Sequence, residues 1–402
     1  MKINLKKLLD NTIATSVVFI FIFFITLLPD ISQSFDIVEK VINDIDVTDY
    51  YFSRIMSEQK IDTNIILVNI GNLERDSIGL ELDIIMKEQP AVVGIDAYFR
   101  HKKDKKKDSI LASILNKYNN IVLGSVFISS KHNIASTEEP DTLIHPLPEF
   151  INNNYFGFLN LEGDYNETKR IFKTYINYND SIYYPFGTVI ANIYDSNKIR
   201  TLLSRGNDFE TIRYIGDHKK FTTFDIEQIF DSSVSKSKMK GKIVLMGYLG
   251  SSIVDTFSCY DKFFTPLNEK YFGRSLPDMH GLAIHANIIY MILNSRYIYT
   301  IPTWIIWSIS FLILLINISI YETIKIKFPK LYGGEIKILV LFEIILIIIL
   351  TILLFKNFYI KLNITLLFFA LLIGPDISEM YFSSIKSLFD RLTNRRSKNE
   401  KS

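Results

Sequence analysis

The sequence predicts an α/β domain, with a parallel core sheet and added antiparallel strands, that is joined to four transmembrane helices. The chain is 48% hydrophobic and yet 22% charged, too hydrophobic for an ordinary soluble protein and too charged for one wholly in the membrane. One long apolar run lies near the N-terminus and three follow residue 300. Between them, short apolar runs alternate with helical patterns, which is typical of parallel βαβ units.

The four apolar runs cover 12–28, 301–321, 338–355 and 362–381. Basic residues precede the first run, fill the loop around Lys325 to Lys330 and close the chain after Arg391, so the positive-inside rule places all three clusters in the cytoplasm. The predicted organisation is a cytoplasmic start and helix (1–29), an extracytoplasmic domain (30–299), three transmembrane helices (300–381) and a basic cytoplasmic tail (382–402). This predicts a multi-pass protein of a bacterial inner membrane, with the lipid bilayer as its first partner.

The N-terminal run has a second interpretation. Ser32-Gln33-Ser34 is a small-x-small site, as in a cleaved signal peptide. The long apolar core and the Pro29-Asp30 pair favour a retained anchor instead. Either way, the segment that follows is exported.

Within the exported domain, apolar runs at 64–70, 90–96, 121–127 and 243–246 predict buried strands, and periodic segments at 36–58, 78–87, 108–118 and 280–293 predict helices. Short strand signals near 173–178 and 212–215 predict the antiparallel strands added to the core sheet. The charge run 101–108 is interpreted as a solvated loop with a helix N-cap at Asp108. The alternative is a contact to an anion or a lipid headgroup.

Several motifs share one order along the chain: Ile66 to Ile70 (ILVNI), Val92 to Asp96 (VVGID), Lys242 to Gly247 (KIVLMG), Asp255, Thr265-Pro266, and His280 to Ala286 (HGLAIHA). This order resembles the bacterial CHASE type-2 domain, an extracellular sensory module followed by three membrane helices. Here the proline of the family's Pro-Gly pair is displaced to Pro277. The resemblance implies detection of an extracytoplasmic signal and a membrane-anchored mode of action.

Candidate ligand-binding residues lie where the parallel strands end, because open α/β sheets bind ligands beyond the carboxyl ends of their strands. These residues are Asn69, Gly71, Asp96, Ser125, Gly247 and Asp255, together with Thr265 of the family motif. Asp96 and Asp255 can accept hydrogen bonds from a ligand or hold a cation through oxygen. The plainer interpretation is that both cap turns or helix N-termini.

The sequence predicts neither a metal nor a cofactor. His280 and His285 are five residues apart and point to different faces of one helix, unlike the i, i+4 pair of a zinc helix. Cys259 is the single cysteine, so it joins no Cys/His cluster. The net charge of +2 gives no reason to expect nucleic acid. Without a nucleophile elbow, phosphate loop or kinase signature, we expect no enzymatic activity.

Two acidic residues fall inside the predicted membrane helices. Glu343 lies in the third and Asp376 near the inner end of the fourth. Ionisable groups at this depth usually face a partner or a cavity, so both are candidates for membrane coupling. Glu343 is close enough to the interface for snorkelling to explain it equally well.

The favoured function is a sensor that detects an extracytoplasmic signal. Only a short basic tail follows the last helix, so we expect the signal to pass to a separate partner protein, by way of helix packing or a possible homodimer. Two rivals remain open. One is a non-catalytic structural or assembly subunit of an envelope complex, and the other is an enzyme that uses Asp96 and Asp255.

Overall fold

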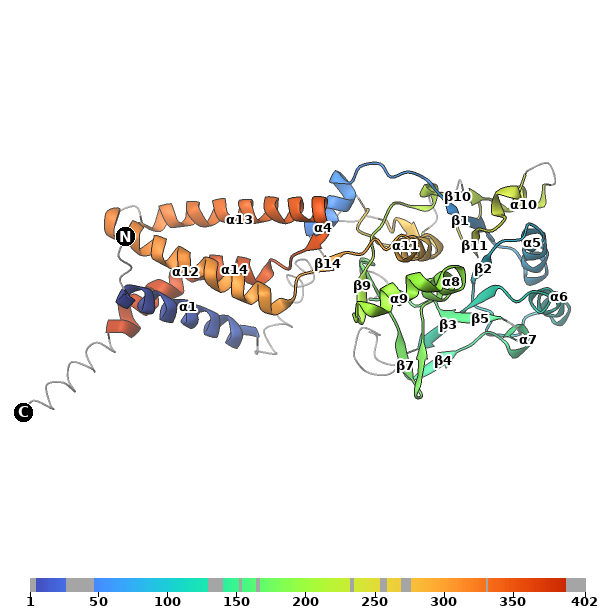
Figure 1. Ribbon diagram of the computed structural model, residues 1–402, viewed down its shortest axis with the longest axis horizontal. Helices are drawn as coiled ribbons and strands as arrows, with labels where there is room; N and C mark the ends of the chain where they lie inside the picture. Colours follow the sequence, from blue (N-terminus) through green and yellow to red (C-terminus); the bar gives the residue numbers. More distant parts are fainter. Residues whose placement is uncertain are drawn as a thin grey trace, which may run out of the picture. The chain divides into compact units, whose positions relative to one another are not determined.

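The computed structural model describes residues 5–26, 47–128, 140–151, 154–163, 167–231, 235–253, 259–268, 276–329 and 332–387. The chain divides into two compact units. One holds Asp49–Ile298 and is an α/β domain. The other holds Met1–Thr48 and Tyr299–Ser402 and contains the long apolar helices (Figure 1).

Seven strands form the main sheet of the described α/β unit, in the order β10-β1-β11-β2-β3-β4, with β5 also paired to β3. Their bounds are β1 (Asp62–Asn69), β2 (Val92–Asp96), β3 (Ile121–Ile128), β4 (Thr142–Ile144), β5 (Tyr155–Phe158), β10 (Phe221–Phe224) and β11 (Ile243–Gly247). All pairs are parallel except β3 with β4. The predicted α/β class with a parallel core sheet is therefore confirmed.

Helices cover both faces of this sheet (Figure 1). Alternate strand residues such as Ile66 and Val93 pack against α5 (Arg75–Lys87) and α6 (Lys105–Leu115). The intervening residues, such as Leu67 and Val92, pack against α8 (Phe186–Tyr194) and α11 (Gly281–Leu293). Because both faces are buried, the strands are continuous apolar runs, which is why the sequence revealed them.

Short elements surround the sheet. They are α4 (Val47–Tyr50), the π-helical turn η1 (Tyr51–Ile55), α7 (Pro148–Ile151), β6 (Ile171–Lys173), β7 (Ile176–Tyr178), β8 (Ser181–Tyr183), α9 (Ser196–Ser204), β9 (Phe209–Thr211), η2 (His218–Lys220), α10 (Ile226–Phe230), η3 (Ser237–Met239), β12 (Lys262–Phe263) and β13 (Met279–His280). Of the predicted helix 36–58, the part before Val47 lies outside the described residues.

The sequence prediction was wrong about the antiparallel strands near 173–178 and 212–215. β6 pairs with β9, and β7 with β8, in separate two-stranded sheets, while β4 is the strand that joins the core sheet antiparallel.

The charged run before α6 also differs from its prediction. Asp104, not Asp108, is the N-cap, since its carboxylate accepts hydrogen bonds from the backbone N–H groups of Lys106 and Lys107. Asp108 lies one turn inside the helix, where it is buried and pairs with Arg75 at 2.7 Å. Asp104 and Asp108 are four residues apart, so the sequence allows either to cap the helix. Asp108 is instead engaged by Arg75, 33 residues away in the chain, and Asp104 is the cap.

Four helices in the other unit are long and apolar enough to cross a membrane: Leu5–Ile25, Thr303–Lys327, Gly333–Phe358 and Thr365–Ile385. They belong to α1 (Leu5–Thr26), α12 (Thr303–Lys327), α13 (Tyr332–Phe358), and α14 (Thr365–Met380) with its π-helical extension η4 (Tyr381–Ile385). β14 (Tyr299–Thr300) pairs in parallel with β15 (Ile360–Lys361), which ties the chain entering α12 to the α13–α14 connection.

Polar contacts join these helices. Glu343 of α13 accepts a hydrogen bond of 2.8 Å from the side-chain amide of Asn317 on α12, so it faces a partner within the helix bundle. Asp376 is exposed on α14 and makes no hydrogen bond or ion pair with another described residue. Two ion pairs join α1 to other helices: Lys386 pairs with Asp10 at 2.5 Å, and Lys7 pairs with Glu322 at 3.2 Å. The N-terminal part of α1 therefore lies beside the C-terminal ends of α12 and of the α14–η4 helix.

Candidate functional site

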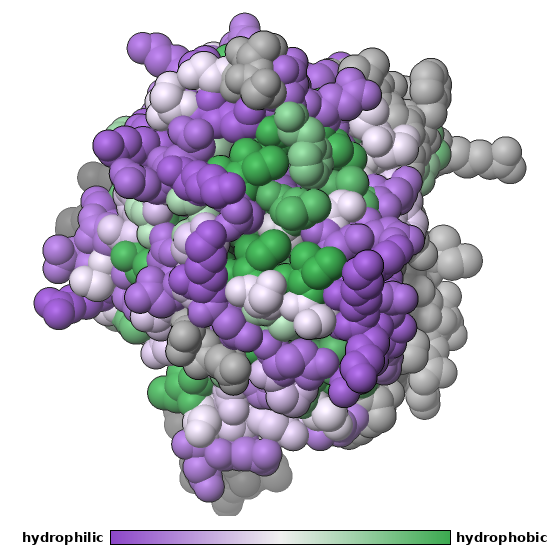
Figure 2. All heavy atoms as spheres, turned by 90° about the vertical axis from the view of Figure 1, so that its right-hand side faces the viewer, coloured by the Kyte–Doolittle hydropathy of each residue, from purple (hydrophilic) through white to green (hydrophobic). Residues whose placement is uncertain are grey.

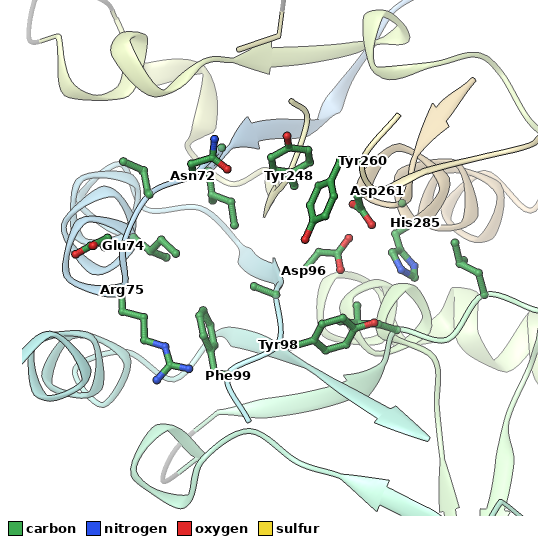
Figure 3. Close-up of a pocket in the computed structure, with 18 of the residues that line it drawn as sticks. Asn72, Glu74, Arg75, Asp96, Tyr98, Phe99, Tyr248, Tyr260, Asp261 and His285 are labelled. Atoms are coloured by element: carbon green, nitrogen blue, oxygen red, sulfur yellow. The ribbon is translucent and has the colours of Figure 1, made fainter. Parts of the chain in front are cut away.

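A cavity of about 840 Å³ opens beyond the carboxyl ends of the parallel strands in the α/β unit (Figure 3). Its walls include the loop after β1, the end of β2, the residues after β5 and β11, and the first turns of α11. This is where an open α/β sheet binds its ligands, and the volume falls in the range of small-molecule sites. The lining combines carboxylates, tyrosines, lysines and apolar side chains.

Two carboxyl groups, Asp96 at the end of β2 and Asp261 in the turn before β12, interact in this cavity. Burial, followed by the charge of Asp261, raises the pKa of Asp96 to about 8, and burial raises the pKa of Asp261 to about 6. Two carboxylates that share a site cannot both ionise freely. At neutral pH the pair therefore retains about one proton, which is the state of a coupled dyad.

The position of Asp261 follows from the pairing of β12 with β13. Lys262 is opposite His280 in that pair, and the Gly281 backbone N–H donates to the Asp261 carbonyl oxygen at 3.2 Å. A Cβ atom on Gly281 would lie 3.7 and 3.8 Å from the two carboxylate oxygens of Asp261. The Asp261 side chain is thus held against the first turn of α11.

Tyrosines and a histidine surround the carboxyl pair (Figure 3). The pKa of Tyr98 is raised to about 12, by burial first and then by the charges of Asp96 and Asp261. Tyr260 packs its ring edge-on against Tyr248, with centroids 5.1 Å apart. His285 reaches the cavity from α11, and burial lowers its pKa to about 4, so its imidazole is neutral at physiological pH.

Of the four cations in the cavity wall, Lys103 is exposed, and the other three are engaged by other groups. Arg75 pairs with buried Asp108, donates to the His101 carbonyl oxygen at 2.7 Å and lies over the rings of Phe99 and Phe150. Lys107 pairs with Glu74. Lys169 is 2% exposed and donates to the carbonyl oxygens of Glu162 and Gly163 at 3.1 and 2.8 Å. None of these partners is the Asp96–Asp261 pair.

Of the residues predicted from the sequence to bind a ligand, Asp96 and Gly71 line this cavity. Asn69 is fully buried beneath it, and its amide is saturated by the protein itself. The amide nitrogen donates to Asp225 and to the Gly250 carbonyl oxygen, and the amide oxygen accepts from the backbone N–H groups of Gly71 and Leu249. Asn69 therefore fixes the loops that follow β1 and β11.

Ser125, Gly247 and Thr265, also predicted, are not part of the lining. Ser125 is buried in β3. Gly247 allows close packing, since a Cβ atom there would lie 2.8 Å from Leu282 and 3.1 Å from the Asp96 Cβ. Thr265 donates its hydroxyl to Asp278 at 2.5 Å, which orders the loop before β13. Asp255 lies outside the described residues.

Asp261, Tyr98 and Tyr260 were not predicted from the sequence. The predicted residues lie at strand ends, whereas Asp261 and Tyr260 belong to an irregular segment that reaches the cavity through the β12–β13 pairing. Tyr98 is only two residues beyond Asp96, the last residue of the predicted strand, so the sequence could have identified it as a candidate. The ring of His285 packs against that of Phe186, with centroids 5.3 Å apart, and His285 also borders the cavity.

The chain matches the CHASE2 domain over residues 27–320, well over half of its 402 residues. The protein belongs to the CHASE2 domain family, a family of sensory domains. The comparisons found no match among curated proteins and none among solved structures.

Proposed function

We propose that the protein is a sensor of the bacterial inner membrane that detects a small molecule outside the cytoplasm and signals through a separate partner protein. Membership of a sensory domain family and four apolar helices support this proposal. The observation that carries it is the cavity at the carboxyl edge of the sheet, which contains a carboxyl pair that no described cation neutralises. The arrangement of basic residues along the chain supports an extracytoplasmic α/β unit.

Helix α11 is the proposed route from the cavity toward the membrane. Gly281 and His285 border the cavity at its N-terminal end. The helix ends at Leu293, and the chain then continues through β14 into α12. A ligand that shifts the first turns of α11 would act on a helix that is buried along its length, and a buried rigid helix moves as a body.

A second connection leads from α11 to the first residues of the α/β unit. Asn287 of α11 accepts from the Ile215 backbone N–H at 2.8 Å and donates to the Gly216 carbonyl oxygen at 2.9 Å. The adjacent residue, Tyr214, donates its hydroxyl to the Lys169 carbonyl oxygen at 2.7 Å and packs edge-on against Phe52 of η1. Both ends of the α/β unit are thereby joined through the 214–216 segment.

A structural or assembly role in an envelope complex is the second candidate, and one observation favours it. Apolar side chains gather within a polar rim on the face of the α/β unit formed by α5, α6 and α10 (Figure 2). Leu80 of α5 is 53% exposed and Phe230 of α10 is 43% exposed. Exposed apolar patches of this kind mark interaction surfaces.

Affinity purification of the full chain from native membranes in mild detergent, with mass spectrometry of the co-purified proteins, distinguishes the two functions. We expect a stoichiometric cytoplasmic effector, whose yield changes in the Ala97→Trp variant because the indole fills the cavity. Leu80→Lys serves as the matched surface variant and should leave the effector bound. Recovery of envelope proteins alone, lost in Leu80→Lys and unaffected by Ala97→Trp, would instead establish the structural role.

A further inference from the structure

The Asp96–Asp261 pair in the cavity is not compensated by a described cation. No described residue donates a hydrogen bond to the side-chain oxygens of either carboxylate, and neither forms an ion pair. The carboxylates that line the other end of the cavity differ in this respect, because Glu74 pairs with Lys107 and Asp104 caps α6. A buried carboxylate is stable when it is paired, and no described cation pairs with either carboxylate at this end of the cavity.

His285 provides an independent observation at the same place. It is 3% exposed, and its Nδ1 has no hydrogen-bond partner among the described residues. The Leu159 backbone holds the other ring nitrogen, so Nδ1 of the neutral ring is an acceptor. Figure 3 shows the imidazole on the same side of the cavity as the two carboxyl groups. A buried acceptor without a donor is destabilising, and a ligand N–H group would satisfy it.

The arrangement favours an organic cation over a metal ion. Among the described residues, no three His, Cys, Asp or Glu side chains converge to hold a metal, whereas Ca²⁺ requires six or more oxygen ligands. An ammonium group has three N–H donors, one for each of two carboxyl groups and one for the imidazole. Tyrosine faces also attract organic cations, and Tyr98 and Tyr260 lie beside the pair (Figure 3).

We propose that this cavity binds a small organic amine, whose ammonium group lies between Asp96, Asp261 and Nδ1 of His285. The inference rests on the proposed sensory function and names the chemical class of its ligand. The rest of the amine lies against the apolar part of the lining, which includes Ile70, Leu73, Phe99 and Leu159. A cavity of about 840 Å³ leaves room for a body well beyond the ammonium group itself.

Three probes with the same aromatic body test the charge preference: phenethylamine, 2-phenylethanol and phenylacetate. Binding of each to the full chain in lipid nanodiscs is measured by isothermal titration calorimetry at pH 7.5. We expect phenethylamine to bind at least tenfold more tightly than the other two. Asp96→Asn and Asp261→Asn should each weaken phenethylamine tenfold or more, while Asp76→Asn, a carboxyl on α5 outside the lining, should not.

Thermal melting of each variant shows whether it is folded. Equal binding of the amine and the alcohol, equal binding to the Asp→Asn variants, or no binding of the amine to the folded wild-type protein would each overturn the assignment. Preferential binding of phenylacetate would overturn the amine assignment and leave the sensory function standing. The sensory function itself fails separately, in the co-purification experiment with Ala97→Trp, which uses no probe.

Discussion

Arg170 forms an ion pair with Asp49 through two of its guanidinium nitrogens. Nε is 3.1 Å from both carboxylate oxygens, and Nη2 is 2.6 Å from one of them. The Asp49 side chain is 1% exposed and that of Arg170 is 16% exposed. The pair joins the segment that enters the α/β unit to the strand β6 region, close to the 214–216 segment that contacts α11.

We predict that breaking this pair destabilises the α/β unit. Asp49→Ala removes the carboxylate from a nearly buried guanidinium, and the cost of breaking such an ion pair is about 3–5 kcal/mol. Arg170→Lys should lose a large part of the interaction, because an ammonium cannot reproduce the two-nitrogen contact. Denaturant unfolding monitored by circular dichroism checks both. The exposed pair Lys325–Glu379 is the control, and an equally small effect at both pairs would refute the prediction.

The carboxyl pair predicts a pH dependence of stability. The pKa of Asp96 is raised to about 8 and that of Asp261 to about 6, so the folded state holds protons that the unfolded chain releases near its ordinary pKa of about 4. The stabilising contribution of the protonated pair is thus lost as the pH rises from about 4 to 8. Asp96→Asn removes the ionisation, and its melting temperature should exceed that of the wild type increasingly toward pH 8.

The titratable groups around Asp96 and Asp261 do not account for this pH dependence of stability. The titratable or charged groups of the cavity around the pair are Tyr98, Tyr248, Tyr260, His285 and Lys169, with Arg100 acting on Tyr98. Burial keeps the pKa of His285 at about 4, and that of Tyr98 is about 12, so both remain neutral between pH 5 and 8. A constant difference in melting temperature between Asp96→Asn and wild type across this window would contradict the prediction.

We predict that replacing the buried Glu81 with an apolar residue stabilises the protein. The Glu81 side chain is fully buried on the core face of α5, and neither carboxylate oxygen has a hydrogen-bond partner among the described residues. Burial, followed by the charge of Asp225, raises its pKa to about 8. Glu81→Met, which keeps the length and removes the polar atoms, should raise the free energy of unfolding at pH 7 by about 2–4 kcal/mol.

Chemical denaturation at pH 7 measures this effect, with Glu227→Met on the exposed side of α10 as the control expected to change stability by less than about 0.5 kcal/mol. If Glu81→Met lowered the stability, the buried carboxyl would have a structural role that its contacts do not reveal. In that case Glu81→Gln, which restores hydrogen-bonding capacity, should recover the loss.

Topology can be tested by labelling. After Cys259→Ser, a single cysteine at Lys105 in α6 should react with a membrane-impermeant maleimide in intact spheroplasts. A single cysteine at Lys327, at the end of α12, should react only after lysis. Both lysines are exposed, so access to the reagent depends on the side of the membrane. Labelling of the two positions in the opposite order would invert the proposed orientation.

Much of this architecture could be predicted from the sequence because it depends on local patterns. Strand β11 and helix α11 are continuous apolar elements bounded by polar residues, and each was predicted to within a residue or two. Asp96 was predicted as a candidate site residue because it ends a buried strand. Its partner Asp261 was not, since a two-residue strand pairing has no periodicity that a sequence displays.

Asn69 illustrates the opposite limit. An asparagine at the end of a parallel strand is placed where ligand-binding residues occur. Only the structure shows that both amide atoms of Asn69 form hydrogen bonds to backbone groups and Asp225. Asp104 and Asp108 are a similar case, in which a long-range partner, Arg75, determined which aspartate caps the helix. Local pattern identified the edge of the sheet at which the cavity lies, and tertiary contacts determine which residues line it.

Hydrogen exchange of the full chain in nanodiscs tests most directly whether the cavity communicates with α11. We would compare the wild type, the wild type with phenethylamine and the Ala97→Trp variant, following peptides that cover 279–298. Filling the cavity by either means should change exchange throughout α11 and into residues 294–298. Changes confined to the loops that line the cavity, with α11 unaffected in both cases, would contradict a sensor that signals through this helix.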